Sequence, residues 1–353
     1  MNTLSEYVEQ AKASDYFSAA RVANDLQHFL DKCSAQCTQL GEDARRSAAH
    51  LFLVGSGGSL ANLQSAKYII DRLSTIPCDV LPSYELVWRR PVSMNEHALV
   101  VLNSYSGETE DTLAAFRCAK AAGARTVALV RSAASTLGRE ADAAVEYESS
   151  ALYEAPLAAI TLLASRLASG DSGTKEANAL VGSLNHLPKV LRTVVEREAH
   201  RAEALAREFL YSNQMYVLGA GPLSPLAWKV AMSVLMENVR IAGSYCDASE
   251  FRHGPAEALE RLRPDMMFLV GTDESRELTL RTLEFCRSHG AHALVYDAQD
   301  FGDDVHPLLT PLVMNSVTQW FVVYSAILRG ILDLDHRVFM GHNVLGSNGA
   351  KWP

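Results

Sequence analysis

The stretch that organises this chain is ALVVLNSYSGET, residues 98–109, in which an apolar run leads directly into a cluster of hydroxyl side chains. The run predicts a buried strand, and the residues after Thr109 predict a helix. Hydroxyl groups and backbone N–H groups therefore converge on a turn where the first helical N–H groups lack partners and the helix dipole is positive. Such a turn can hold a phosphate, and it needs no lysine of the Walker type. An ordinary turn with a Ser or Thr helix cap is the alternative interpretation of these residues.

The length and composition indicate a globular protein with more than one domain. The chain has 353 residues, which exceeds a single ordinary core and suggests two units of similar size. Its 48% hydrophobic and 21% charged residues argue against extensive disorder. The net charge of −9 argues against a nucleic acid or an anionic membrane as a partner, although a local group of donors can still hold a phosphorylated metabolite.

The N-terminus and the cysteines favour a cytoplasmic protein. Residues 1–6 lack a basic region that leads into an apolar core, and no uninterrupted apolar stretch approaches about 18 residues. The six cysteines show no paired CxxC spacing, so we expect reduced, mostly buried thiols and no zinc site.

The first half of the chain alternates between strands and helices after a predicted helical N-terminal lead, residues 1–48. Apolar residues recur at helical intervals over about 4–48, and a strand at 51–54 then meets the turn GSGGS, residues 55–59. A helix over about 60–73 follows, and the further strand candidates are residues 80–81, 99–102, 126–130 and 144–147. This alternation predicts a parallel sheet that is covered by helices on both faces.

The same pattern recurs in the second half, which indicates a duplicated unit. The strand candidate 215–218 leads into a glycine turn and an apolar helix through Glu237, and the candidate 266–270 leads into a second turn and helix. The two turns of each half are similarly spaced, with 49 residues from Gly55 to Ser104 and 53 from Gly219 to Thr272. We therefore expect one domain over residues 49–190 and a second over 191–353.

Only the first copy is expected to bind a phosphate. The second copy has Asp273 and Glu274 where the first has Tyr105 and Ser106, and a carboxylate there would repel a phosphate. The turn at residues 55–58 is also no dinucleotide fingerprint, because it lacks the GxGxxG spacing and the acidic Asp71 falls within the following helix. A nicotinamide cofactor is therefore not expected.

The GSGGS and SYSGET turns and the duplicated sheet together resemble the sugar isomerase (SIS) domain family over about residues 46–340. Within that family, EFRHGP at residues 250–255 is similar to the Glu-x-x-His-Gly-Pro signature of fructosamine-6-phosphate deglycases and of the isomerase half of glucosamine-6-phosphate synthase. The resemblance implies an α/β fold of two tandem SIS domains, each a doubly wound, flavodoxin-like parallel sheet in a three-layer αβα arrangement.

The resemblance also implies the site residues. Glu237 matches the proton-transfer base of these enzymes, and its position 16 residues before His253 agrees with the family pattern. His253 would assist ring opening from the neighbouring subunit, which implies a homodimer with the active site at the subunit interface; a higher oligomer is the alternative. The residues implied to bind substrate are Gly57, Ser59, Ser104, Tyr105, Ser106, Gly107 and Thr109. A solvated helix charge at Glu237 and a helix-capping role for His253 are the alternatives.

The chain departs from the synthase pattern in three places. The glutaminase domain is missing, with Asn2 in place of its nucleophilic cysteine, so glutamine is not expected as a nitrogen source. The tail DHRVFMG, residues 335–341, resembles the deglycase tail and suggests Amadori-type substrates. In one interpretation, His336, Arg337 and His342 enter the pocket and meet the carboxylate of an amino-acid leaving group; in the other, they belong to a flexible, solvated tail. Residues 152–156 lack the Ser-Thr-Lys of the synthase, so its sugar contacts there are not carried over.

These residues favour proton transfer without a metal or a redox cofactor. One carboxylate can move a proton between C1 and C2 of an aminated sugar phosphate, and water can hydrolyse the imine that results. We therefore expect a cytoplasmic, dimeric enzyme that deglycates the fructosamine or glucosamine 6-phosphate of an amino acid. The alternatives are an aminosugar-phosphate isomerase or deaminase and, in another class, a non-catalytic regulator that binds sugar phosphates.

Overall fold

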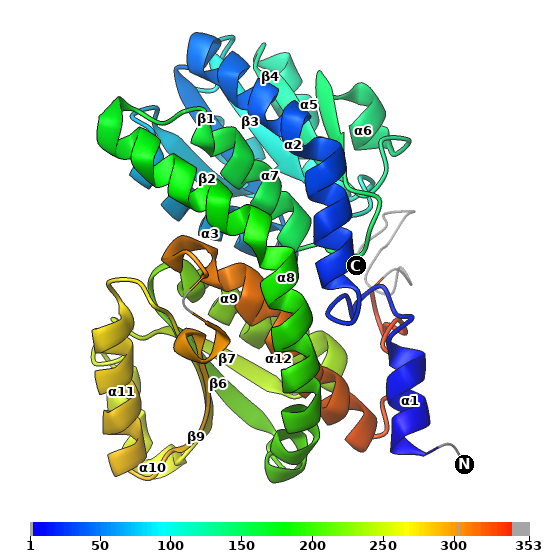
Figure 1. Cartoon of the computed structure of the whole chain (residues 1–353), viewed down its shortest axis with the longest axis vertical. Coiled ribbons are helices and arrows are strands. Elements are labelled where there is room, and N and C mark those ends of the chain that lie inside the picture. Colours follow the sequence, from blue (N-terminus) through cyan, green and yellow to red (C-terminus); the bar gives the residue numbers. More distant parts are fainter. Residues whose placement is uncertain (1–2, 303, 341–353) are drawn as a thin grey trace.

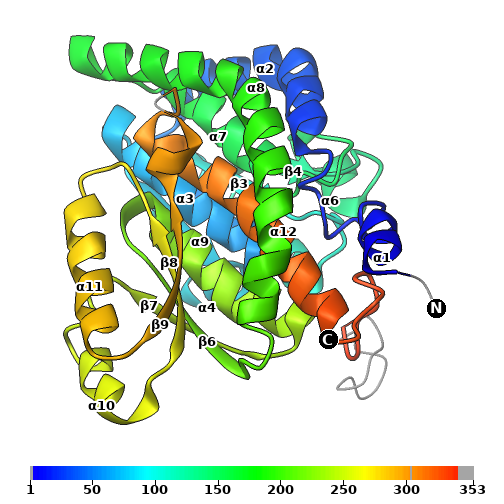
Figure 2. The ribbon, with the colours of Figure 1, turned by 60° about the horizontal axis from the view of Figure 1, so that its bottom comes forward.

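The computed structural model describes residues 3–302 and 304–340. Figures 1 and 2 show two parallel sheets, each covered by helices, that form two lobes of the molecule. The long helix α8 (Gly170–Glu208) runs alongside both lobes in Figure 1. The predicted domain boundary between residues 190 and 191 lies inside this helix.

The first sheet has five strands in the order β2-β1-β3-β4-β5, and all its pairings are parallel. Its strands are β1 (His50–Gly55), β2 (Cys78–Pro82), β3 (Ala98–Asn103), β4 (Arg125–Val130) and β5 (Ala143–Glu146). Its helices are α3 (Gly57–Leu73), α4 (Ser83–Arg89), α5 (Glu110–Ala121) and α6 (Thr136–Glu140). Every residue of β3 is buried, as expected of a strand covered on both faces. The strand order reverses between β1 and β3, and ligands of doubly wound sheets bind in the crevice at such a point.

The second sheet has the order β7-β6-β8-β9, which repeats the order of the first sheet without its last strand. Its strands are β6 (Gln214–Gly219), β7 (Ala242–Asp247), β8 (Asp265–Val270) and β9 (His292–Asp297). The connecting helices are η1 (Gly221–Leu223), α9 (Ser224–Lys229), η2 (Val230–Val239), η3 (Pro255–Ala258), α10 (Leu259–Leu262), α11 (Arg276–Ser288), η4 (Ala298–Phe301) and η5 (Pro307–Leu309). Strands β7 and β9 were not among the predicted strands, and β7 is only partly buried and carries Gly243 and Ser244. The tandem doubly wound α/β fold is nevertheless confirmed.

The prediction of a continuous N-terminal helix over 4–48 is wrong, because the chain forms α1 (Leu4–Ala11) and α2 (Val22–Ser47) with an irregular segment between them. In that segment, the fully buried Phe17 packs its ring against the edge of Trp320, with 4.7 Å between centroids. The Arg21 guanidinium donates a hydrogen bond of 3.0 Å to the Ser14 carbonyl, which stabilises the turn. Contacts with a helix about 300 residues away therefore override the local helical periodicity.

A shared hydrophobic core joins the two lobes. It contains buried side chains from α2, α3, α7 (Glu154–Ser165), α8 and α12 (Thr310–Leu328) together with strands of both sheets. Residues 307–328 are the one segment of the described chain that is long and apolar enough to cross a membrane, and 83% of its apolar window is buried inside the protein. Such burial is typical of a core helix of a globular protein.

Candidate functional site

The turns after β1 and β3 lie side by side at the carboxyl edge of the first sheet. Asn103 ends β3, and its amide donates hydrogen bonds of 3.2 Å to the Ser59 carbonyl and 3.0 Å to the Asn62 side chain. A Cβ atom on Gly55 would lie 3.2 Å from the Asn103 carbonyl oxygen, so a glycine permits this close approach. The N-termini of α3 and α5 consequently lie next to the same crevice.

Within the SYSGET turn, the predicted phosphate-binding residues divide into two groups. Ser104 is buried, and its hydroxyl accepts a 3.1 Å hydrogen bond from the Gly107 N–H and lies 2.9 Å from the Thr109 hydroxyl. Gly107 is also buried and has φ +66°, a conformation that favours glycine. Ser106 and Thr109 are exposed toward the crevice. Ser104 and Gly107 therefore shape the turn, while the exposed hydroxyls are available to a ligand.

A cavity of about 440 Å³ lies in front of these turns and combines residues of both lobes. Its volume is within the range of small-molecule sites. The lining residues are Tyr16, Ser18, Ser56, Gly57, Gly58, Ser59, Tyr105, Ser106, Thr109, Leu152, Lys229, Ser233, Val234, Glu237, Asn238, Gln319, Val322, Val323, Leu334 and Met340. Five of the predicted substrate-binding residues thus share one cavity with the predicted base Glu237.

Glu237 projects into this cavity from η2, which is a π-helix. π-Helices are rare and occur frequently at functional sites. The Glu237 carboxylate accepts a 2.9 Å hydrogen bond from the Ser233 hydroxyl one turn earlier, and its other oxygen lies 3.6 Å from Nε of Arg337. With 30% of its side chain exposed, Glu237 is held in place but remains accessible from the cavity.

His253 lies elsewhere in the chain. It follows β7 in an exposed turn, where its Nε2 accepts a 3.1 Å hydrogen bond from Nε of Arg252, and it is not among the described residues that line the cavity. A single chain therefore does not bring His253 to Glu237.

Lys229 is a cavity residue that the sequence reasoning missed. It is only 6% exposed, and its Nζ donates a 2.7 Å hydrogen bond to Asn315 Oδ1. The Asn315 amide donates a 2.7 Å hydrogen bond to the buried carboxylate of Glu154, which also accepts one of 2.9 Å from Ser316. Burial lowers the pKa of Lys229 to about 8, against the opposing effect of the charges of Glu154 and Glu237, and burial raises the pKa of Glu154. A lysine inside the apolar stretch LAWKVA, residues 226–231, was the signal available in the sequence.

The described part of the tail covers one side of the cavity. Arg337 is 9% exposed, and its guanidinium lies 3.9 Å from the centroid of the Tyr16 ring and donates a 3.2 Å hydrogen bond to Asn238. Among the other predicted tail residues, His336 is exposed, and His342 lies outside the described residues. The structure thus places one basic tail side chain beside Glu237.

The corresponding turns of the second lobe are occupied by the protein itself. A Cβ atom on Gly221 would lie 2.7 Å from Asp273 Oδ1, so the carboxylate fills the space in front of that glycine turn. Asp273 also accepts a 2.9 Å hydrogen bond from the Ser275 N–H. This arrangement is in keeping with a single phosphate loop, in the first lobe.

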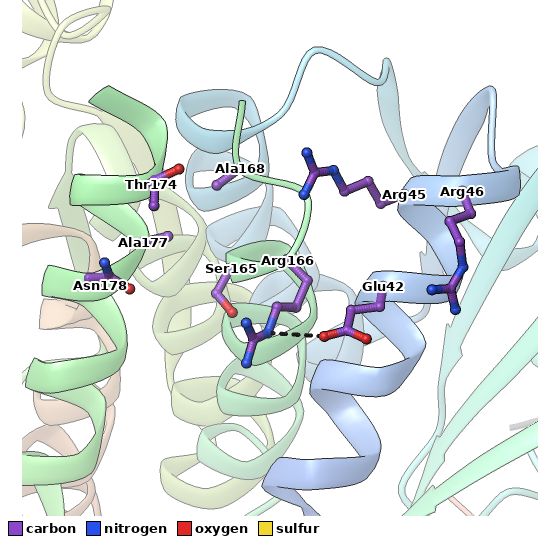
Figure 3. Close-up of a pocket in the computed structure, with 9 residues that line it drawn as sticks. All are labelled: Glu42, Arg45, Arg46, Ser165, Arg166, Ala168, Thr174, Ala177 and Asn178. Atoms are coloured by element: carbon purple, nitrogen blue, oxygen red, sulfur yellow. Dashed lines mark ion pairs between the residues drawn. The ribbon is translucent and has the colours of Figure 1, made fainter. Parts of the chain in front are cut away.

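A second hollow, of about 500 Å³, has a simpler explanation. Figure 3 shows Arg45, Arg46 and Arg166 around it, with the ion pair between Arg166 and Glu42 at 3.9 Å. These arginines lie at the C-terminal ends of α2 and α7, where a cation stabilises the helix dipole. The hollow shares no residue with the cavity that contains Glu237.

Comparison with known proteins finds similarity to phosphosugar enzymes. A family model described as SIS domain matches residues 46–168. The chain is 27% identical to fructoselysine 6-phosphate deglycase of Escherichia coli strain K12, over 82% of this chain and 84% of that protein. It is 29% identical to fructosamine deglycase FrlB of Bacillus subtilis strain 168, over 92% of this chain and 98% of that protein. A crystal structure from Bacillus subtilis described as a phosphosugar isomerase superposes with a TM-score of 0.76 and 28% identity, over 87% of this chain and 98% of that one.

Proposed function

Because this chain is an enzyme of the SIS domain family, we propose that it deglycates the fructosamine or glucosamine 6-phosphate of an amino acid, releasing a sugar phosphate and the free amino acid. The observation that carries this proposal is that Ser59, Ser106 and Thr109 line the same cavity as Glu237. The printed names of the two deglycase relatives support the choice of substrate class.

In this proposal, the phosphate binds at the paired turns of the first lobe. A phosphate there receives hydrogen bonds from the hydroxyls of Ser59, Ser106 and Thr109. It also faces the N-termini of the helices α3 and α5, which are 17 and 12 residues long. Backbone N–H groups and the helix dipole favour an anion at these ends. The rest of the sugar then extends across the cavity toward the second lobe.

Glu237 is the proton-transfer base of the proposed reaction. For a ketosamine, it removes a proton from C1, the electron pair of that bond forms a C1–C2 double bond, and the carbonyl pair moves to the C2 oxygen. Glu237 then returns the proton to C2, the nitrogen lone pair forms a C–N double bond, and the N–H proton moves to the C2 oxygen. Water adds to this imine, and cleavage of the C–N bond releases the amine, so the overall reaction is a hydrolysis.

The proposal includes a cytoplasmic homodimer whose subunits share the active site. His253 is exposed and lies outside the cavity of its own chain, so it can take part only if another chain brings it to Glu237. An imidazole there can open the sugar ring at neutral pH. In the proposal, Arg337, which lies beside Glu237, meets the carboxylate of the amino acid.

Amine release from defined substrates tests the proposal. The purified enzyme is incubated with the phosphorylated sugar adducts of lysine, asparagine and arginine, and with that of a simple alkylamine, which lacks the carboxylate that Arg337 would bind. Glu237→Gln keeps the size of the side chain and should lower turnover by about 10²- to 10⁴-fold with little change in affinity for a sugar phosphate. The matched control is Glu284→Gln on an exposed position of α11, which should retain wild-type activity.

The products distinguish the alternatives. A free amino acid supports deglycation, whereas ammonia from an aminosugar phosphate indicates the isomerase or deaminase. Tight binding without conversion of any adduct indicates a regulator and rejects the proposal, as does full activity of Glu237→Gln.

A further inference from the structure

Lys229 lines the same cavity as the GSGGS and SYSGET turns and Glu237. It is the last residue of α9, and the π-helix that carries Glu237 begins at the next residue. Its aliphatic part packs against the GSGGS turn, since a Cβ atom on Gly58 would lie 3.3 Å from Lys229 Cε. The side chain therefore forms part of the cavity wall next to the GSGGS turn, where the sugar phosphate of the proposed function would lie.

The surroundings of Lys229 leave part of its hydrogen-bonding capacity available. Within residues 3–302 and 304–340, Nζ donates one hydrogen bond, to Asn315, and lies 5.1 Å from the centroid of the Tyr153 ring. An ammonium group has three N–H donors. Two N–H groups thus remain for a ligand in the cavity, and Asn315 orients the ammonium by bridging it to Glu154.

We propose that Lys229 is a further catalytic residue, whose ammonium group donates a hydrogen bond to the C2 oxygen of the ketosamine and stabilises the negative charge that develops there. This inference rests on the proposed function. As Glu237 takes the C1 proton, the carbonyl electron pair moves to the C2 oxygen and is met by a fixed positive charge. Lys229 keeps its protons throughout, since the C2 oxygen receives its proton from the nitrogen. One preorganised donor of this kind contributes about 10²- to 10³-fold to turnover.

The competing explanation is a structural one, in which Lys229, Asn315 and Glu154 only join the two lobes. Glu154 lies on α7, Lys229 on α9 and Asn315 on α12, and removal of one of two buried opposite charges leaves the other without compensation. A single Lys229 variant could therefore lose activity because it unfolds. The double variant E154Q/K229M removes both charges and separates stability from catalysis.

The experiment compares K229M, E154Q/K229M and the control K67M, whose lysine forms an exposed ion pair with Asp71. Melting temperature, affinity for glucitol 6-phosphate, turnover and the exchange of the C1 hydrogen of the ketosamine with solvent are measured. We expect E154Q/K229M to fold, to bind glucitol 6-phosphate within about threefold of wild type, and to lose about 10²- to 10³-fold in both turnover and exchange. Turnover of E154Q/K229M within about threefold of wild type overturns the proposal.

The pH profile gives a readout that a structural role would not change. The titratable groups that face Lys229 are Glu154 on α7, Tyr153 directly before that helix, and Glu237 on η2. The Glu154 charge raises the pKa of Lys229, so E154Q should move the alkaline decline of turnover to lower pH. An unchanged profile in E154Q contradicts the proposal.

Failure of the proposed function gives a different result. Wild-type enzyme that releases no amine from any adduct rejects deglycation. The exchange of the C1 hydrogen of fructose 6-phosphate with solvent still tests Lys229 in that case, because it requires the same charge on the C2 oxygen. Equal exchange by wild type and E154Q/K229M rejects the role of Lys229.

Discussion

Replacement of Gly107 by alanine should destabilise the SYSGET turn, and the loss of unfolding free energy can be worked out from the structure. Gly107 has φ +66°, and its Cβ atom would lie 2.1 Å from the Oγ and 2.5 Å from the Cβ of Ser135. A non-glycine residue in the left-handed region costs about 1–2 kcal/mol. Overpacking against buried atoms costs a further 1–3 kcal/mol or so. The free energy of unfolding of Gly107→Ala should therefore fall by about 2–5 kcal/mol.

Gly182→Ala is the matched control for this substitution. Gly182 lies inside α8 with no atom within 4 Å of an added Cβ, so alanine should raise the unfolding free energy by about 0.5–1 kcal/mol. Urea denaturation of both variants and the wild type, followed by circular dichroism, measures these opposite effects.

The binding of a sugar phosphate should follow the same pattern. A shift of the Gly107 backbone would move the backbone N–H groups at the proposed phosphate site. The affinity of Gly107→Ala for a sugar phosphate should therefore fall by about tenfold for each 1.4 kcal/mol of binding free energy that is lost. Gly182→Ala should bind as the wild type does. If Gly107→Ala were as stable as the wild type, the conformation assigned to this turn would be refuted.

Two further predictions concern the subunits and the pH. The variants Glu237→Gln and His253→Ala should each be inactive alone. When the two variants are unfolded and refolded together, activity should return to about a quarter of the wild-type value, because half the dimers then carry one intact site of their two. The absence of any recovery would contradict a site shared between subunits. The pKa of Lys229 is lowered from its ordinary 10.5 to about 8, so the unfolded chain binds more protons between these values and stability should rise with pH across that window. Denaturation at pH 7.5 and 9.5 should show a gain in the free energy of unfolding of at most about 1.4 kcal/mol per pH unit in the wild type relative to E154Q/K229M. An equal change of unfolding free energy with pH in both proteins would show that Lys229 does not titrate in this range.

Much of the fold and the position of the hydroxyl turn could be predicted from the sequence because they depend on local patterns. The apolar runs and glycine turns identify β1, β3, β6 and β8, and parallel strands bring their carboxyl ends to one edge of a sheet. The SYSGET turn directly follows β3, so its place beside the GSGGS turn follows from the strand order alone.

The remainder of the site depends on contacts between residues that are far apart in the chain. Asn315 meets Glu154 across 161 residues and Lys229 across 86, and Arg337 reaches Asn238 across 99. No periodicity encodes such pairs, because they exist only once the two lobes pack around α12. The same packing breaks the predicted N-terminal helix at Phe17.

By itself, the sequence determined the alternation of strands and helices, the duplication and the place of the hydroxyl turn, since each arises from neighbouring residues. Tertiary structure alone decided that Lys229 shares a cavity with that turn and with Glu237, and that His253 of the same chain does not line it. The physical reason is that burial and charge pairing of these side chains depend on how the lobes pack, which is a property of the whole fold.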